Sequence, residues 1–171
     1  MTNNRKEYAV KFTAQEKAKL LSIKPDNSPL LPDEILAKTL VSVISSGTET
    51  VGGYCATHYQ ATNTYPKPTG YASISQVTEV GEEVKGVKPG DLVLGGCHQS
   101  YQRGPEENFV KVPDGLAPEI AVFGRMAKIS MPAIIRSEVR PPEIMVVTGL
   151  GLVGMLAAQL GQSFGYQVIA C

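Results

Sequence analysis

The stretch that decides the fold runs from Glu143-Ile-Met-Val-Val-Thr148 directly into Gly149-Leu-Gly-Leu-Val-Gly154. The first six residues are mostly apolar, which is typical of a buried strand. After the glycines, Leu156–Gly165 has the composition of a helix, and Tyr166–Cys171 is again strand-like. This order predicts one strand–turn–helix–strand unit that opens a parallel α/β sheet.

Three glycines at GxGxxG spacing give the turn its chemistry. Gly149 allows a tight turn out of the strand, Gly151 allows a pyrophosphate to approach the backbone, and Gly154 allows the helix to pack closely on the strand. The N–H groups and partial positive charge of the helix N-terminus then attract the anion. The alternative is a glycine-rich turn in some other βαβ unit. The predicted cofactor-binding residues are Gly149, Leu150, Gly151, Leu152, Val153 and Gly154.

The choice between NAD and NADP stays open. The acidic residue that binds the ribose lies about 20 residues beyond the turn in such folds, and the second strand here ends at Cys171. A complete sheet of this kind has roughly six strands, and this stretch supplies two. We therefore expect a truncated domain that binds nicotinamide cofactor weakly by itself, and a homo-oligomer or association through the incomplete sheet.

Composition excludes several classes of partner. The 171 residues have a formal net charge of zero and 19% charged side chains, which favours neither nucleic acid nor a membrane surface. No apolar run approaches the ~20 residues of a membrane span, and the N-terminus lacks a signal-peptide core. These features predict a cytoplasmic protein. Its cysteines, Cys55, Cys97 and Cys171, show no paired spacing and are expected to be reduced thiols.

The sequence before the glycine turn consists mainly of strands and turns, followed by a helical segment. Alternation and β-branched residues predict strands at Glu7–Phe12, Ala18–Ile23, Glu34–Ile44 and Tyr71–Val80. Val87–Gly96 is predicted as a turn followed by a strand, and Glu107–Leu116 as a strand ended by a Pro-Asp-Gly turn. The alternation of Tyr71–Val80 is imperfect, which suits a strand covered on both sides. From Pro118 the spacing is helical, and Pro132 is expected to break or kink the helix. Arg125, Lys128 and Arg136 are expected on its solvated face.

Four segments in this order resemble the medium-chain dehydrogenase/reductase superfamily, the relatives of zinc-type alcohol dehydrogenases. They are LPDEILAKTLVSVISSGTE (31–49), PTGYASISQVTEVGEEVKGVKPGDLVLG (68–95), NFVKVPDGLAPE (108–119) and VVTGLGLVGMLAAQLGQSFGYQVIAC (146–171). The resemblance implies a mainly β, GroES-like barrel over residues 1–117 that holds the catalytic site. It further implies a connecting helix and linker over 118–142, and the start of a dinucleotide-binding Rossmann domain over 143–171, an incomplete α/β βαβ unit.

The resemblance also implies that the catalytic zinc ligands are lost. Ser46 stands where zinc-binding members have cysteine, and Tyr71 and Ala72 stand where they have histidine and glutamate. The later ligand position falls near Gly124–Arg125. None of these residues is a good ligand, because zinc prefers thiolate, imidazole or carboxylate. We therefore expect no metal at this position.

An unusual metal site made from other residues is the alternative. Cys55 and His58 have ligand-like spacing, and Cys97 is adjacent to His98. Adjacent residues on a strand point in different directions, and nothing in the sequence brings the two pairs together.

Without zinc, a hydroxyl is the expected partner of a substrate carbonyl. Thr48 matches the hydroxyl position of the family's proton relay and is the first catalytic candidate, with capping of a local turn as its structural alternative. Tyr71 is the second candidate, as a hydrogen-bond donor. Its structural alternative is a buried tyrosine that only fills the space of the lost ligand. Glu49 is expected to be structural, in a hydrogen bond or an ion pair.

These observations predict a zinc-independent, NAD(P)-dependent oxidoreductase that moves a hydride between its cofactor and a small alcohol or carbonyl substrate. One alternative is a zinc-less quinone or enoyl reductase, which reduces C=C bonds. Another is a non-catalytic, nucleotide-binding or regulatory module that has kept the glycine turn and lost the catalytic ligands. A purely structural barrel would leave the glycine turn unexplained.

Overall fold

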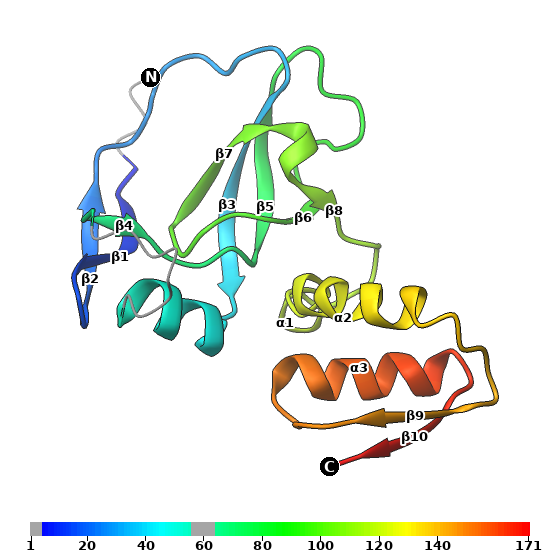
Figure 1. The fold of residues 1–171 in the computed structure, drawn as a ribbon. Helices are drawn as coiled ribbons and strands as arrows, with labels where there is room; N and C mark the ends of the chain where they lie inside the picture. The colour runs from blue at the N-terminus through cyan, green and yellow to red at the C-terminus, as the bar shows by residue number, and fades with distance from the viewer. Residues whose placement is uncertain (1–4, 56–63) are drawn as a thin grey trace. The chain divides into compact units, whose positions relative to one another are not determined.

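A computed structural model describes residues 5–55 and 64–171, and the chain divides into two units, Met1–Val122 and Phe123–Cys171 (Figure 1). The first unit is rich in strands, and the second combines helices with a pair of parallel strands. The mainly β character before Pro118 and the α/β character after it are as the sequence predicted.

A five-stranded antiparallel sheet forms the larger part of the first unit. Its strands lie in the order β7 (Tyr101–Pro105), β3 (Glu34–Ser42), β5 (Ser73–Val80), β6 (Leu92–Leu94) and β8 (Val110–Lys111). The central pair, β3 and β5, is the longest, because its β-branched and apolar residues can be buried on both faces.

The buried residues of this sheet explain the imperfect alternation of β5. Ser73, Ile74 and Ser75 are consecutive and all fully buried, so both faces of β5 are covered at its start, as predicted. One face contributes Val77 to a core cluster with Ile35, Ala37 and Val93. The serines on the covered positions find partners: Ser73 donates to the Gly95 carbonyl, and Ser75 pairs with Thr39 at 3.2 Å.

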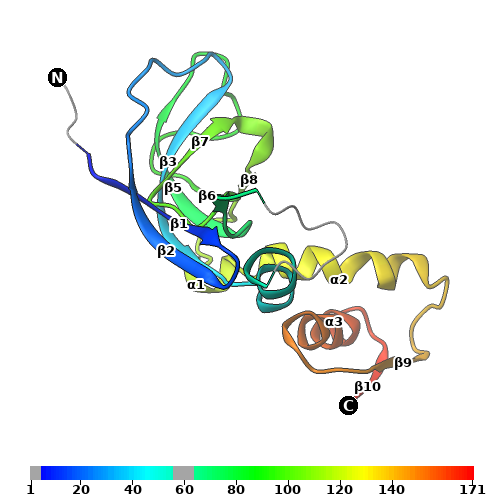
Figure 2. The same cartoon turned by 60° about the vertical axis from the view of Figure 1, so that its left-hand side comes forward.

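A second, three-stranded sheet has the order β2 (Lys17–Ile23), β1 (Glu7–Ala14) and β4 (Lys67–Pro68), again antiparallel. Figure 2 shows β1 and β2 as a curved hairpin. Both hairpin strands were predicted from the sequence. The short strands β4 and β7 were not, because neither has a run of alternating residues long enough to indicate a strand.

The segment Cys97–Ser100 joins the two sheets. The carbonyl of His98 accepts a hydrogen bond from the N–H of Val10 in β1 at 2.8 Å. Two residues later, Ser100 donates its N–H to Tyr8 in β1 at 2.8 Å and accepts from the N–H of Thr39 in β3 at 2.9 Å. This segment is therefore held between β1 and β3 by backbone bonds on both sides.

The described residues of the first unit also form three short helical segments: η1 (Thr48–Tyr54), which is wound as a π-helix, η2 (Glu106–Asn108), a 3₁₀ turn, and α1 (Pro118–Ala121). Of the strand predicted within Glu107–Leu116, only β8 forms, because η2 covers the start of the segment. The turn predicted at its Pro-Asp-Gly end is present. The π-helical winding of η1 is unusual, since such turns are rare and occur often at functional sites.

The second unit contains α2 (Gly124–Arg136), β9 (Ile144–Val147), α3 (Leu152–Ser163) and β10 (Gln167–Ala170). The two strands are parallel, with α3 as the crossover between them (Figure 1). The helices α2 and α3 are joined by a hydrogen bond from the Ser130 hydroxyl to the Val153 carbonyl at 3.0 Å. The strand–turn–helix–strand prediction is confirmed.

Pro132 does not break its helix. α2 continues through Pro132 to Arg136, and Figure 2 shows it as one helix. The helical segment is interrupted earlier, between Ala121 and Gly124. Arg136 and the other two basic residues of this helix, Arg125 and Lys128, are exposed as expected. Within the described residues, no helix has the length and apolar character needed to cross a membrane.

Candidate functional site

The glycine turn joins β9 to α3. Gly149 has a positive φ of 84°, which an L side chain rarely adopts, and its N–H donates to the carbonyl of Cys171 at 2.6 Å. Gly151 is the N-cap of α3, and no side chain caps it. A Cβ built at Gly154 would lie 2.0 Å from the carbonyl oxygen of Gly149, whereas one at Gly151 would meet nothing within 4 Å.

The surroundings of Gly154 and Gly151 differ, and the difference bears on anion binding. Gly154 is required by the protein's own packing, because the first turn of α3 lies against the carbonyl of Gly149. Gly151 has open space in front of it, so its lack of a side chain serves something other than internal packing. The first N–H groups of a helix have no partner within that helix, and the arrangement is suited to an anion.

A second cluster lies in the first unit, around His98. The ring is buried, with 8% of the residue exposed. Its Nδ1 lies 2.8 Å from the Ser42 hydroxyl, and its Nε2 lies 3.2 and 3.1 Å from the two carboxylate oxygens of Glu49. Three residues far apart in the sequence, at the end of β3, in η1 and after β6, therefore form one hydrogen-bonded chain.

The neighbours of this chain fix its geometry. Glu49 accepts the N–H of Ser45 on Oε1 at 2.8 Å, so its carboxylate is held by the backbone that leads into η1. The N–H of His98 donates to the Thr69 carbonyl at 2.8 Å. A Cβ at Gly70, which has a φ of 76°, would lie within 2.7 Å of three atoms of the His98 ring. Gly70 therefore allows the imidazole to pack directly against the backbone.

The cluster opens into a cavity of about 360 Å³, which we call the Phe12 pocket. Phe12 and Tyr54 form one wall, in edge-to-face contact with ring centroids 6.0 Å apart. Gly53 makes this possible, because a Cβ there would lie 2.2 Å from the Phe12 ring. The residues that line the pocket are Val10, Phe12, Ala18, Ser42, Ile44, Glu49, Thr50, Tyr54, Thr69 and His98.

The thiol of Cys97, which precedes His98, is unreactive at neutral pH. Burial raises the pKa of Cys97, and the negative charge of Glu49 raises it further. The thiol is therefore protonated at neutral pH, which makes Cys97 a poor nucleophile and a poor metal ligand.

Both predicted catalytic residues are next in sequence to a residue that contacts the His98 ring. Thr48 is exposed at the start of η1, directly before Glu49. Tyr71 is half-buried and follows Gly70, the residue that packs on the His98 ring. The expectation that Glu49 lies in a hydrogen bond or ion pair is confirmed by its contact with His98.

The residues that the sequence resemblance matches to zinc-ligand positions lie in different surroundings. Ser46 is exposed, and Ala72 is buried directly before β5. Across 5–55 and 64–171, no group of three or more histidine, cysteine, aspartate or glutamate residues is placed to hold a metal ion. The alternative site with Cys55 and His58 lies partly outside the described residues, because His58 is not among them.

Sequence reasoning missed His98 and Ser42 as members of a site. His98 was considered only as a metal ligand, and Ser42 only as part of a strand. One signal was available: Gly95-Gly96-Cys97-His98 follows β6 directly, and paired glycines there indicate a backbone that leaves the sheet and brings the next residues into the interior.

Comparisons with known proteins agree with this architecture. No family model matches the chain. Acryloyl-coenzyme A reductase of Metallosphaera sedula is 28% identical over 140 residues, which cover 61% of this chain and 42% of that protein.

Solved structures match over nearly the whole chain. The complex of Etr1p with NADP and crotonyl-CoA has a TM-score of 0.73 at 21% identity, covering 97% of this chain and 54% of that one. Quinone oxidoreductase of Escherichia coli in complex with NADPH has a TM-score of 0.76 at 19% identity, covering 95% and 52%. The chain thus spans about half the length of the proteins it matches.

The solved structures show that the chain has the fold of these reductases over nearly its whole length. The resemblance of its sequence to the medium-chain dehydrogenase/reductase superfamily agrees with this likeness and with the similarity to acryloyl-coenzyme A reductase.

Proposed function

We propose that this chain is part of an NAD(P)-dependent reductase that adds hydride to a C=C bond conjugated to a carbonyl, without zinc at the family's catalytic position. The observation that carries the proposal is the β9–α3 turn, with open space at Gly151 and a positive φ at Gly149. The similarity to acryloyl-coenzyme A reductase and to Etr1p with NADP and crotonyl-CoA favours the C=C bond as the target.

The residues of the turn fit a dinucleotide through their backbone. Gly149, Gly151 and the N–H groups that open α3 would hold the pyrophosphate, and Gly154 keeps the helix close to β9. The other three predicted residues, Leu150, Leu152 and Val153, would contribute N–H groups rather than side chains. A nicotinamide dinucleotide held there supplies the hydride. These residues do not distinguish NAD from NADP.

The first unit would bind and orient the substrate. We propose the predicted GroES-like barrel over 1–117 as this substrate-binding part, with 118–142 as the connection and 143–171 as the cofactor part. Thr48 would donate a hydrogen bond to the substrate carbonyl or orient it, and Tyr71 would be a second donor. Both act on the oxygen at which negative charge develops when hydride arrives.

Reduction of a small alcohol/carbonyl pair is the second candidate. It is favoured by Thr48, which matches the hydroxyl of the family's proton relay.

A substrate screen that follows NADPH or NADH oxidation separates the candidates, since crotonyl-CoA is expected to be reduced and simple ketones are not. A non-catalytic module would oxidise neither cofactor, and Thr48→Ala would then change nothing. In the natural protein we expect Thr48→Ala to lower kcat/KM by ~10²-fold.

Binding of a dinucleotide to this chain tests the interpretation of the β9–α3 turn. We expect titration with NADPH or NADH to move the amide resonances of 149–154 in heteronuclear NMR spectra. Gly151→Ala has room for its methyl group in the fold, so it should leave the fold intact and weaken binding by ~10-fold or more, because the methyl group occupies the approach of the pyrophosphate.

Gly104→Ala is the matched control, since a Cβ there makes only ordinary contacts at 3.8 Å and beyond. It should bind like the unmodified chain. Amide shifts that spare the turn, or equal affinities of the two variants, would contradict the proposal.

A further inference from the structure

The Phe12 pocket has a polar corner and apolar walls. Ser42, Glu49 and His98 line the corner, and Thr69 lies beside them. Val10, Phe12 and Ile44 supply apolar surface. A pocket of this kind accepts a small apolar group that carries one hydrogen-bonding atom, because the apolar part is buried by the walls and the polar atom is oriented by the corner.

The Glu49 carboxylate determines which ring nitrogen of His98 carries the proton. An ionised carboxylate can only accept hydrogen bonds, and both of its oxygens lie within 3.2 Å of Nε2. The neutral imidazole therefore carries its hydrogen on Nε2. Its Nδ1 is then an acceptor, and it faces the hydroxyl of Ser42 at 2.8 Å. Glu49 thus prepares His98 to exchange a proton with Ser42.

We propose that Ser42, His98 and Glu49 form a proton relay that opens into the Phe12 pocket, where Ser42 acts on the carbonyl oxygen of a small apolar ligand. The inference rests on the proposed reductase function only for the source of the hydride. Within the relay, Ser42 is the catalytic residue, because it lines the pocket. His98 and Glu49 are positioning residues that act through it.

The proton balance of the relay is simple. With His98 protonated, Nδ1–H donates to Ser42, and the Ser42 hydroxyl donates to the ligand oxygen. Hydride addition at the far carbon of the conjugated C=C bond places negative charge on that oxygen. The oxygen takes the Ser42 proton, Ser42 takes the proton of Nδ1, and His98 becomes neutral with its hydrogen on Nε2. The product is an enol, which becomes the saturated carbonyl compound, and solvent returns one proton to His98.

Any buried histidine needs hydrogen-bond partners for its ring nitrogens. For His98 these partners are the Ser42 hydroxyl and the Glu49 carboxylate, and both residues line the pocket, as His98 itself does. A histidine that only filled the core would need no partners at a pocket. Glu49 belongs to η1, and π-helical turns are rare and occur often at functional sites.

The first experiment reads the tautomer of His98 by long-range ¹H–¹⁵N NMR in alkaline buffer. The chain has only two histidines, and His98→Asn assigns the signals. We expect hydrogen on Nε2 in the unmodified chain. In Glu49→Gln, the amide oxygen keeps the bond from Ser45 and the amide NH₂ faces Nε2, so the hydrogen should move to Nδ1. Hydrogen on Nδ1 in the unmodified chain would overturn the relay.

The second experiment measures ligand binding without any cofactor, with 2-cyclohexen-1-one as the probe. We expect the probe to shift resonances of Phe12, Ile44 and Tyr54, and Ser42→Ala to weaken it by several-fold. Ser75→Ala is the matched control, because Ser75 is a buried strand serine with one side-chain partner and does not line the pocket. Shifts elsewhere, or equal binding by both variants, would overturn the assignment of the pocket.

Measurements of turnover distinguish a failure of the relay from a failure of the proposed reductase function. In the natural protein with NADPH and crotonyl-CoA, Ser42→Ala should lower kcat by ~10²-fold with a smaller change in KM, and Ser75→Ala should not. If the unmodified protein oxidises NADPH and both variants match it, the relay is wrong and the reductase stands. If the unmodified protein oxidises no cofactor, the reductase fails, and the tautomer and binding experiments decide the relay and its pocket.

Discussion

Gln102 holds the backbone of the Cys97–His98 segment from inside the fold. It is buried in β7, with 3% of the residue exposed. Its amide nitrogen donates to the Cys97 carbonyl at 2.8 Å and to the Thr39 hydroxyl at 3.0 Å, and its oxygen accepts the Cys97 N–H at 3.2 Å. Gly96, with a φ of 93°, leaves room for this side chain. One glutamine thus satisfies both backbone groups of the residue that precedes His98.

Removal of Gln102 is expected to be costly. Gln102→Leu keeps much of the volume but leaves the Cys97 N–H without its acceptor, while the Cys97 carbonyl keeps the bond from the Gln99 N–H. The free energy of unfolding should therefore fall by about 1–3 kcal/mol. Gln76→Leu is the control, because Gln76 is exposed and the change should be within about 0.5 kcal/mol. Urea denaturation measures both, and similar losses in the two variants would contradict this interpretation of Gln102.

At the scale of elements, α2 tolerates a proline at an unfavourable position. Pro132 is exposed in the interior of the helix, where it cannot donate to the carbonyl of Lys128. Pro132→Ala should restore that bond and raise the free energy of unfolding by about 1–3 kcal/mol. Pro118→Ala is the control, because Pro118 opens α1, where proline is favoured. No stabilisation in thermal or urea unfolding of Pro132→Ala would show that tertiary contacts require the proline.

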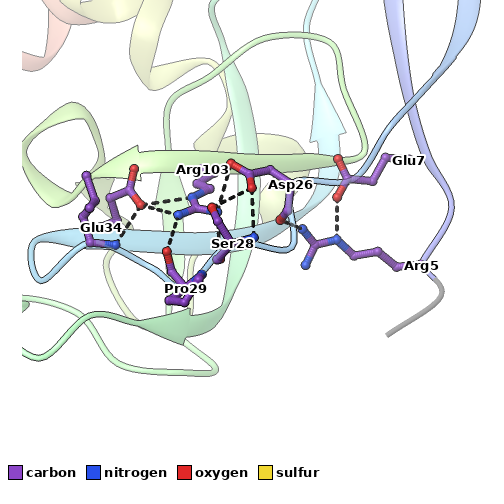
Figure 3. A network of polar contacts seen from close by, with 8 residues as sticks. Arg5, Glu7, Asp26, Ser28, Pro29, Glu34 and Arg103 are labelled. Carbon is purple, nitrogen blue, oxygen red and sulfur yellow. Dashed lines mark hydrogen bonds and ion pairs between the residues drawn. The ribbon is translucent and has the colours of Figure 1, made fainter. Parts of the chain in front are cut away.

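A second element-scale feature is the clamp on the loop between β2 and β3. Arg103 in β7 contacts Glu34 at 2.8 Å and Asp26 at 3.1 Å, and it donates to the carbonyls of Ser28 and Pro29 (Figure 3). The side chain therefore ties the loop to the edge of the five-stranded sheet. A further pair, Arg5 with Glu7, lies beside it.

The clamp makes stability depend on pH. Hydrogen bonds from Ser28, and then the charge of Arg103, lower the pKa of Asp26. The Leu31 N–H, and then Arg103, lower the pKa of Glu34. Because both carboxyls have lower pKa values in the folded chain, their contribution is complete above the ordinary carboxyl range and is lost as pH falls through the lowered values.

We therefore expect the melting temperature to fall between about pH 5 and pH 3, and less steeply in Arg103→Met. The slope should not vanish in this variant, since Asp26 keeps its bonds from Ser28. Arg136→Met removes an exposed arginine of α2 and should leave the slope of the unmodified chain. Thermal unfolding across this pH range is the measurement, and equal slopes in all three proteins would refute the clamp.

At the scale of the whole molecule, the chemistry of the first unit predicts independence from zinc. Ser46, Tyr71 and Ala72 offer no thiolate, imidazole or carboxylate at the family's metal position. We expect the purified protein to contain well under one zinc ion per chain by mass spectrometry, and its melting temperature to be unchanged by EDTA. Stoichiometric zinc that is lost in Cys55→Ser would instead support the Cys55–His58 alternative.

Much of the fold could be predicted because its signals are local. The strand, glycine turn and helix of 143–165 follow one another without a gap, and each is recognisable by its own period. The β1–β2 hairpin is predictable for the same reason. Of the strand expected within Glu107–Leu116, only β8 forms, because only these residues find a partner strand. Strand pairing depends on the neighbouring strand and cannot be predicted from the segment alone.

The sequence by itself determined the family resemblance, the βαβ crossover and the absence of good zinc ligands at the usual position. Only the tertiary structure brought His98 to Ser42 and Glu49, which lie 56 and 49 residues away in the sequence. The reason is physical: a glycine turn is formed by neighbouring residues with local conformational needs, whereas a buried hydrogen-bonded chain depends on how sheets meet. Backbone bonds from β1 and β3 to the segment Cys97–Ser100 decide where the His98 ring lies.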